Sequence, residues 1–293
     1  MPRKWTQKSN FGPKGGPNYA MVFDPNRKRT VLKTTDTDTW QWDGLGWIQV
    51  SDMGPRGAST MAYDDDRERI VLLDSSNWNT WEWNTQFWTQ VSDKGPPTTG
   101  IGMGSPAMAY DPRRKRMVVF RGKGTWEWNG SEWSQVDDSG PSLRTDLVLV
   151  RDDARTCLLL FGGYDGAVVN TNVEQAFNDT WNWDGTRWKQ AASFGPSVRM
   201  GMAAAYDTNL ARVILFGGLN IIPRPSPGAA TQSIPTLKND TWEWDGARWV
   251  QLEDIGPTPR RHHAMAYDES RKSVVLFGGE PPGQDTWEFT EQP

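Results

Sequence analysis

A Thr-Trp pair recurs six times along the chain, at intervals of 41, 45, 55, 61 and 45 residues between the tryptophans. The six pairs are Thr39-Trp40, Thr80-Trp81, Thr125-Trp126, Thr180-Trp181, Thr241-Trp242 and Thr286-Trp287. Self-similarity at such a period is the signature of a repeat architecture. The segments between the pairs contain short apolar runs and turn residues, which are typical of β-strands. The chain is therefore predicted to be an array of six small β-sheets.

Each repeat reads as four strands, as the fifth copy illustrates. A small apolar run (203–206) is followed by a turn and then by the continuous apolar run 213–216. The third strand carries Trp242-x-Trp244, which places both indoles on one face because strand side chains alternate. Asp245-Gly246 makes a hairpin turn, and the fourth strand begins at Trp249. Six such units in a radial array predict an all-β fold, a six-bladed β-propeller of four-stranded antiparallel blades.

The two ends of the chain are expected to close the ring. Every copy of the outer-strand motif has a Trp seven residues before a Gly-Pro; these tryptophans are Trp5, Trp47, Trp88, Trp133, Trp188 and Trp249. The last repeat stops at Phe289 and lacks this motif, so Trp5-Thr6-Gln7 is predicted to supply its fourth strand. Residues 1–293 then form a single domain, and the closed ring leaves no open sheet edge.

The chain has 18 tryptophans, and all except Trp78 occupy repeat positions. Their expected role is packing between blades, because aromatic side chains bury much area each. Trp78 lies in the loop after the second strand of copy two. It is a candidate for an exposed contact residue.

The motifs together resemble the kelch repeat across essentially the whole chain. The last copy is the most similar, with Gly256-Pro257, Arg260, His263-Ala264-Met265-Ala266-Tyr267-Asp268 and Phe277-Gly278-Gly279. Copies one to three lack the Gly-Gly pair, and copy four has Val150-Arg151-Asp152 in place of Ala-Tyr-Asp. These departures make the two halves of the ring chemically different.

In relatives that share the kelch repeat, one face of the ring commonly binds the partner or substrate, with an Arg of the first loop contributing. The matching positions are Arg56, Arg144, Arg199 and Arg260. Converging arginines would form a cationic rim suited to carboxylates or phosphates. The alternative is that each Arg is structural and bridges to an Asp of the neighbouring blade or to loop carbonyls.

Two loops after second strands are long, at 164–177 and 219–238, and loops of this length are usually functional or disordered. They are expected to build a wall over one side of the channel mouth. The candidate binding residues at this mouth are Arg56, Arg144, Arg199, Arg260, Arg261, His262, Asp146, Asp165, Glu174 and Trp78.

No catalytic constellation is recognisable in the sequence. His262 and His263 are the only histidines and Cys157 the only cysteine, so neither a metal site nor a cofactor is expected. The several histidines and tyrosines of copper-containing galactose-oxidase-like relatives, and the iron-binding spacing of specifier-type kelch proteins, are both missing. No Ser-His-Asp arrangement, phosphate loop or nucleotide fingerprint occurs.

The composition of the chain limits the classes of partner that it is expected to bind. The net charge is −4 with both signs mixed, which predicts no nucleic-acid partner. No signal peptide or transmembrane segment is evident, so a cytoplasmic location away from membranes is expected. The propeller is expected to be monomeric.

Three functions fit these observations. The first is a non-catalytic binding module that presents its loop face to a protein or peptide. The second is a small-molecule site at the same mouth, for an acidic sugar or carboxylate, in a binding protein or a cofactor-free isomerase, lyase or cyclase. Asp146, Glu174 or His262 would then move protons. The third is a structural subunit of a larger assembly. A deep pocket would favour the second function, and a flat open face would count against it.

Overall fold

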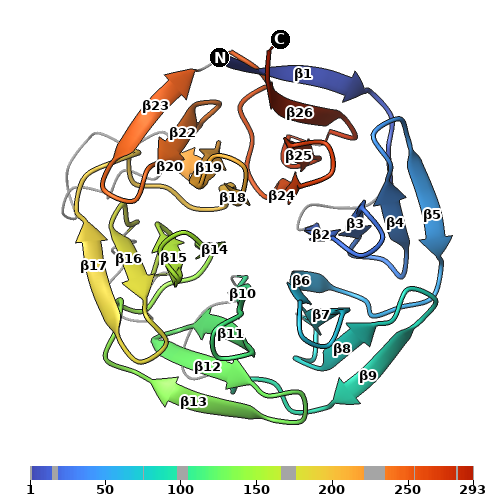
Figure 1. The fold of residues 1–293 in the computed structure, drawn as a ribbon, viewed down its shortest axis with the longest axis vertical. Coiled ribbons are helices and arrows are strands. Elements are labelled where there is room, and N and C mark those ends of the chain that lie inside the picture. Colours follow the sequence, from blue (N-terminus) through green and yellow to red (C-terminus); the bar gives the residue numbers. More distant parts are fainter. Residues whose placement is uncertain are drawn as a thin grey trace, which may run out of the picture.

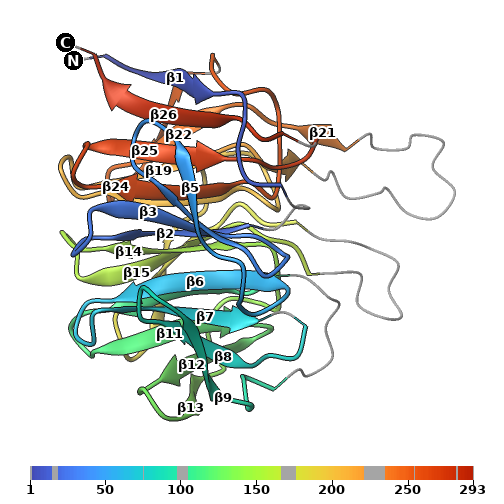
Figure 2. The ribbon, with the colours of Figure 1, turned by 90° about the vertical axis from the view of Figure 1, so that its right-hand side faces the viewer.

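The computed structural model is a closed ring of six four-stranded antiparallel sheets around a central axis (Figure 1). The structure describes residues 2–14, 19–74, 76–97, 105–165, 176–220, 235–253, 255–281 and 283–292. In every blade the strands run in order from the axis to the rim, so the predicted architecture is confirmed. The long approaches to the first strands lie on one side, here called the loop face. The turns between first and second strands lie on the other, here called the turn face (Figure 2).

The first three blades have these strands: β2 (Ala20–Asp24), β3 (Arg29–Lys33), β4 (Thr39–Trp42) and β5 (Trp47–Ser51); β6 (Ala58–Asp64), β7 (Arg69–Asp74), β8 (Thr80–Trp83) and β9 (Trp88–Ser92); β10 (Ala107–Asp111), β11 (Arg116–Arg121), β12 (Gly124–Trp128) and β13 (Trp133–Asp137). The last three blades have these: β14 (Val148–Asp152), β15 (Cys157–Phe161), β16 (Thr180–Trp183) and β17 (Trp188–Ala192); β18 (Ala203–Asp207), β19 (Arg212–Phe216), β22 (Thr241–Trp244) and β23 (Trp249–Glu253); β24 (Ala264–Asp268), β25 (Ser273–Phe277), β26 (Thr286–Glu291) and β1 (Arg3–Ser9). A two-stranded sheet of β20 (Leu219–Asn220) and β21 (Thr236–Leu237) stands at the loop face of blade 5.

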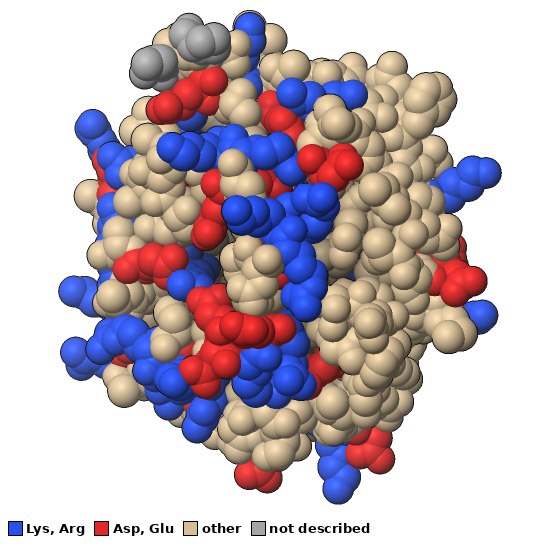
Figure 3. All heavy atoms as spheres, turned by 45° about the vertical axis from the view of Figure 1, so that its right-hand side comes forward, with Lys and Arg blue, Asp and Glu red and all other residues tan. Residues whose placement is uncertain are grey.

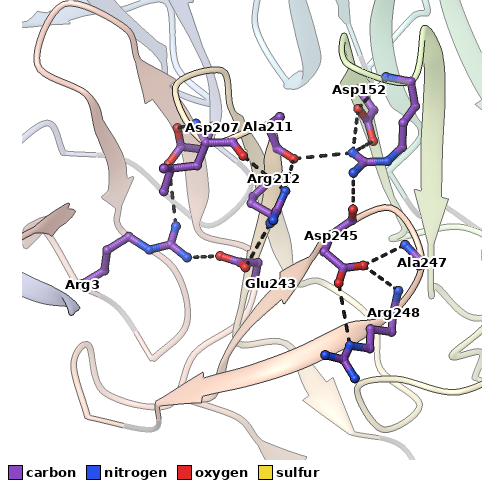
Figure 4. Close-up of polar contacts among 11 residues, drawn as sticks. Arg3, Asp152, Asp207, Ala211, Arg212, Glu243, Asp245, Ala247 and Arg248 are labelled. Atoms are coloured by element: carbon purple, nitrogen blue, oxygen red, sulfur yellow. Dashed lines mark hydrogen bonds and ion pairs between the residues drawn. The ribbon is translucent and has the colours of Figure 1, made fainter. Parts of the chain in front are cut away.

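The N-terminal strand closes the ring, as predicted. β1 pairs antiparallel with β26, with Trp5 opposite Phe289. Arg3 on β1 also reaches blade 5, where it contacts Glu243 and lies 3.7 Å from Asp207 (Figure 4). Glu243 accepts a second hydrogen bond, 3.2 Å long, from Arg212 of its own blade. The closing strand is therefore bound to two blades rather than one.

The hydrophobic core is divided into six clusters, one in each space between adjacent blades. Between blades 2 and 3, for example, Val71 and Leu73 of β7 pack with Val119 of β11 and Trp128 of β12. All four are at most 1% exposed. Second strands are apolar on both faces because each lies between two neighbouring sheets. This arrangement explains why the sequence shows continuous apolar runs there rather than alternation.

A hydrogen bond joins each blade to the next around the whole ring. The Nε1 of each outer-strand Trp donates to the Thr hydroxyl at the start of the third strand in the preceding blade, across 2.7–2.9 Å. The pairs are Trp5 with Thr241, Trp47 with Thr286, Trp88 with Thr39, Trp133 with Thr80, Trp188 with Thr125 and Trp249 with Thr180. The Thr-Trp and Trp-x-Gln motifs thus recur together because each supplies one half of the same inter-blade contact.

The turn face carries the charged, Asp-rich turns. An Asp at the end of each first strand accepts backbone N–H groups of its turn, as Asp64 does from Asp66 and Arg67. Arg67 also pairs with Asp64 at 2.7 Å and lies against the hairpin glycine Gly130 of blade 3. Arg155 likewise donates to the Asp245 carbonyl of blade 5 (Figure 4). Figure 3 shows positive and negative side chains interleaved, without a broad area of one sign.

Candidate functional site

The central channel contains two chambers that meet at an apolar belt. One belt residue comes from each innermost strand: Met21, Met61, Met108, Leu149, Ala204 and Met265. The loop-side chamber has a volume of about 160 Å³ and is also lined by Ser105, Asp146, Gly201 and His262. The turn-side chamber has a volume of about 210 Å³.

The mouth of the loop-side chamber is built by main-chain hydrogen bonds between adjacent blades. The Asp146 N–H donates to the Ser105 carbonyl at 3.0 Å, and the Gly201 N–H donates to the Asp146 carbonyl at 3.0 Å. The His262 N–H then donates to the Gly201 carbonyl at 2.7 Å. These four residues occupy the same position, two residues before the innermost strand, in blades 3 to 6. The contacts hold one side of the mouth rigidly around the axis.

Three of these residues have a left-handed backbone, with φ of 51° at Asp146, 62° at Gly201 and 54° at His262. Such φ values are uncommon for residues other than glycine. At Gly201 an added Cβ would lie 2.8 Å from Cδ2 of His262 and 2.9 Å from its Nε2. The absence of a side chain at Gly201 therefore gives the imidazole its place over the mouth, close to the carboxylate of Asp146.

The charge of Asp146 is only partly compensated by the residues around it. Its Oδ1 accepts the Ser105 N–H at 3.0 Å. Burial raises the pKa of Asp146, and the Ser105 hydrogen bond and the charges of His262 and Arg261 offset this only in part. Arg261 is itself engaged, because its Nε donates to Glu280 at 2.8 Å.

Three of the four predicted binding arginines lie inside their blades. Arg144, Arg199 and Arg260 are at most 3% exposed, and each donates two hydrogen bonds to an Asp of its own blade. In blade 5 the Arg199–Asp240 bonds are 2.7 and 2.8 Å long, and the Gly217 carbonyl accepts another at 2.9 Å. These arginines therefore have a structural role, which was the alternative to ligand binding. The Asp partner belongs to the same blade and not, as that alternative expected, to the neighbouring blade.

The sequence contains a signal for these ion pairs. The Asp directly before the Thr-Trp pair occurs together with the Arg in blades 4, 5 and 6, as Asp179, Asp240 and Asp285. Blade 2 has Arg56 but carries Asn79 at the partner position, and Arg56 is exposed. An Arg and an Asp that occur together in the same repeats are thus the pattern that identifies a structural pair.

The structure places the remaining predicted residues in different surroundings. Trp78 is half-buried and lies under the Arg121 guanidinium, 3.3 Å from the ring centroid, so it is not the exposed contact residue expected. Asp165 is half-buried at the start of the first long loop. Glu174 lies outside the described residues, as do most of the two long loops. His263 is buried against Phe216, and burial lowers its pKa to about 3.

The turn-side chamber has a charged mouth that the sequence did not identify. Arg151 replaces the Tyr found in most first strands, and it contacts Asp153 of its own blade and Asp65 of blade 2. Glu269 of blade 6 lines the same mouth. Burial raises the pKa of Glu269, while the Arg151 charge lowers it. Arg151 thus links blades 2 and 4 across this end of the channel.

The described residues were compared with the requirements of a metal site and of a membrane-spanning helix. Across these ranges, no group of three or more His, Cys, Asp and Glu side chains is arranged to hold a metal ion. In the same part of the chain, no helix has the length and apolar character needed to cross a bilayer.

Comparison with known proteins supports the fold. No protein-family model matches the chain, and no curated protein matches it. Among solved structures, that of YjhT has a TM-score of 0.67 and 13% identity, over 97% of this chain and 98% of YjhT. The gluconolactonase XC5397 from Xanthomonas campestris has a TM-score of 0.60 and 9% identity, over 98% and 89%. An auxiliary nutrient binding protein from Bacteroides thetaiotaomicron has a TM-score of 0.58 and 10% identity, over 98% and 76%. At these identities the likeness shows a shared propeller fold.

Proposed function

We propose that this protein binds a small molecule in the loop-side chamber, through Asp146 and His262. One observation carries the proposal: both residues have left-handed backbone without being glycine, and both line the same chamber. Strained backbone of this kind concentrates at ligand-binding and catalytic sites. A concave cavity in which a few polar groups converge is also the usual form of a small-molecule site.

The proposed ligand enters from the loop face. The apolar belt lies between the two chambers, and Arg151 crosses the mouth on the turn face. A carboxylate beside an imidazole can also serve general acid–base chemistry. A cofactor-free isomerase or lyase activity is therefore an extension of the same site.

Methionine methyl groups report on the chamber directly, because four of the belt residues are methionines. We would screen a small-molecule library by NMR against protein with labelled methionine methyls. The variant Ala204→Phe fills the chamber, and Ala247→Phe on an exposed hairpin is its control. Ligands that shift the belt methyls of wild type and of the control, but not of Ala204→Phe, are expected. If no compound shifts the belt methyls, the proposal is rejected.

A protein or peptide partner is the second proposal, and it is favoured by the sheet of β20 and β21 on the loop face. Variants that test partner binding must change exposed residues, because replacement of the buried arginines would disrupt the blades. Thr236→Arg alters β21, and Thr89→Arg alters the outer strand β9. A partner retained by wild type and by Thr89→Arg, but lost by Thr236→Arg, would support this proposal. Equal retention by all three proteins would count against it.

The kelch assignment belongs to the same set of proposals. It is supported by the motifs of the last copy and by the six-bladed ring that those motifs imply. The buried Arg–Asp pairs give the repeated Arg of these motifs a structural role in blades 4 to 6.

A further inference from the structure

Among the described charged groups around the loop-side chamber, one carboxylate has no ionic partner. Arg144, Arg199 and Arg260 are held in ion pairs inside their blades. Arg261 is paired with Glu280. Within the described ranges, the Ser105 N–H on Oδ1 is the hydrogen bond that Asp146 receives, and no donor reaches Oδ2. Among the described residues that line this chamber, the charge without an ion pair is therefore that of Asp146, and three of the four arginines expected at a cationic rim are paired inside their blades.

The other described titratable groups that line the chamber add no positive charge that would offset Asp146. Tyr19 has its pKa raised by burial and stays neutral. His263 has its pKa lowered by burial and also stays neutral near pH 7. His262 places its Nδ1 3.6 Å from Glu280, so a second carboxylate faces this imidazole.

The chamber combines polar groups at its mouth with an apolar belt at its inner end. The belt presents four methionines, one leucine and one alanine. Methionine is flexible and polarisable, and it adapts to apolar ligands of irregular shape. Hydroxyl groups of a ligand that lay against this belt would lose their water without gaining hydrogen bonds, which is costly. A carboxylate ligand would in addition be repelled by Asp146.

We infer that the ligand of the loop-side chamber is a small organic cation, with an ammonium group on Asp146 and an apolar body against the methionine belt. This inference rests on the proposed small-molecule function. The ammonium donates to Oδ2 of Asp146, the oxygen without a partner among the described residues. A charge-assisted hydrogen bond of this kind is stronger than one between neutral groups. The raised pKa of Asp146 is consistent with a carboxylate that a bound cation would stabilise.

Three probes that differ only in their head group test the inference. n-Butylammonium, n-butanol and butyrate are each titrated into protein with labelled methionine methyls, up to the solubility of the probe. We expect butylammonium to shift the belt methyls with at least tenfold higher affinity than butanol, and butyrate to bind most weakly. In Asp146→Asn the affinity for butylammonium should fall to that for butanol. Asn tolerates left-handed backbone, so this variant is expected to fold.

Asp138→Asn is the matched control, because Asp138 is exposed on the rim and its replacement changes the net charge by the same amount. It should leave all three affinities unchanged. Equal or better binding of butanol or butyrate at the belt would overturn the cationic ligand and leave small-molecule binding intact. An Asp146→Asn variant that keeps its preference for butylammonium would also overturn it. If none of the three probes shifts the belt methyls, the proposed function itself falls.

Discussion

The indole Nε1 of Trp5 donates a hydrogen bond to the Thr241 hydroxyl across 2.8 Å, and this bond joins residues 236 positions apart. It completes a circle of six equivalent bonds, so the last blade is held by the same contact as the others. Both side chains are buried, and neither group has water as an alternative partner. Loss of any one of the six hydrogen bonds would therefore leave a buried polar group unpaired between two blades.

Removing the acceptor of the closing bond should weaken the ring. Thr241→Val keeps the shape of the side chain but leaves the Trp5 N–H buried without a partner, which costs about 1–3 kcal/mol. The measurement is the free energy of unfolding by chemical denaturation. Thr6→Val on the same closing strand is exposed and serves as the control, with little change expected. Equal stability of the two variants would mean that the bond contributes nothing net.

The hairpin of blade 2 is strained at Thr85, whose φ is 89°. The other outer hairpins of blades 1, 3, 4 and 5 have glycine there, with φ between 94° and 103°. Thr85→Gly should stabilise the protein by about 0.5–1 kcal/mol, because relief of the left-handed backbone exceeds the entropic cost of glycine. The comparison is Thr89→Gly on β9, where the same exchange should destabilise. A loss of thermal stability in Thr85→Gly would contradict the strain argument.

Buried and exposed arginines of the same repeat position should behave differently. Arg199→Met leaves Asp240 in the blade without its cation, and breaking a buried pair costs about 3–5 kcal/mol. Arg56→Met removes an exposed side chain and should change stability by less than about 0.5 kcal/mol. Denaturation midpoints of the two variants measure the difference. Similar effects at both positions would show that the Arg199–Asp240 contact is not what stabilises blade 5.

His263 should make the protein less stable in mild acid. Burial, followed by the charges of Arg260 and His262, lowers its pKa from 6.5 to about 3. The unfolded chain therefore takes up a proton below pH 6.5 that the folded chain does not. The free energy of unfolding therefore decreases as the pH is lowered, until the pKa of His263 in the folded protein is reached. Between pH 7 and pH 5 this group lowers the free energy of unfolding by about 2 kcal/mol.

The variant His263→Leu should flatten this part of the stability profile, whatever its effect at pH 7. Unfolding free energies at a series of pH values from 7 to 5 provide the measurement. His262→Gln is the control, because it removes the other histidine and leaves His263 in place. If the slope persisted in His263→Leu and vanished in His262→Gln, the assignment to His263 would be incorrect.

Gly201 is expected to control the position of His262. A Cβ at this residue would approach the imidazole to 2.8 Å, and its φ of 62° also disfavours other residues. Gly201→Ala should cost about 1 kcal/mol in stability and should displace the His262 ring. Histidine side-chain NMR signals would report this displacement, with His263 as the internal reference. Unchanged His262 signals would show that the ring position does not depend on Gly201.

The number of blades and the closure of the ring were both predictable from the sequence. Each copy repeats the same contacts, so one Trp-x-Gln at residue 5 and its absence after Phe289 are enough to indicate the closing strand. The packing role of the tryptophans also follows from their period, since a side chain repeated in every copy must meet a similar neighbour each time. Arg144, Arg199 and Arg260 show where this reasoning stops. They were expected at the channel mouth but lie inside their blades. Their partners Asp179, Asp240 and Asp285 lie 25 to 41 residues away in the chain and come close only when the blade folds.

The sequence by itself determined the strand pattern and the order of the blades, because these depend on local periodicity and turn chemistry. Only the tertiary structure decided which groups face the channel. Ser105, Asp146, Gly201 and His262 belong to four different blades, and main-chain bonds between adjacent blades bring them together. The charge of the loop-side mouth was likewise a tertiary outcome. Arg144, Arg199 and Arg260 are each neutralised by an Asp within their blade. Asp146, in contrast, is held by left-handed backbone at the chamber, where its Oδ2 meets no donor among the described residues.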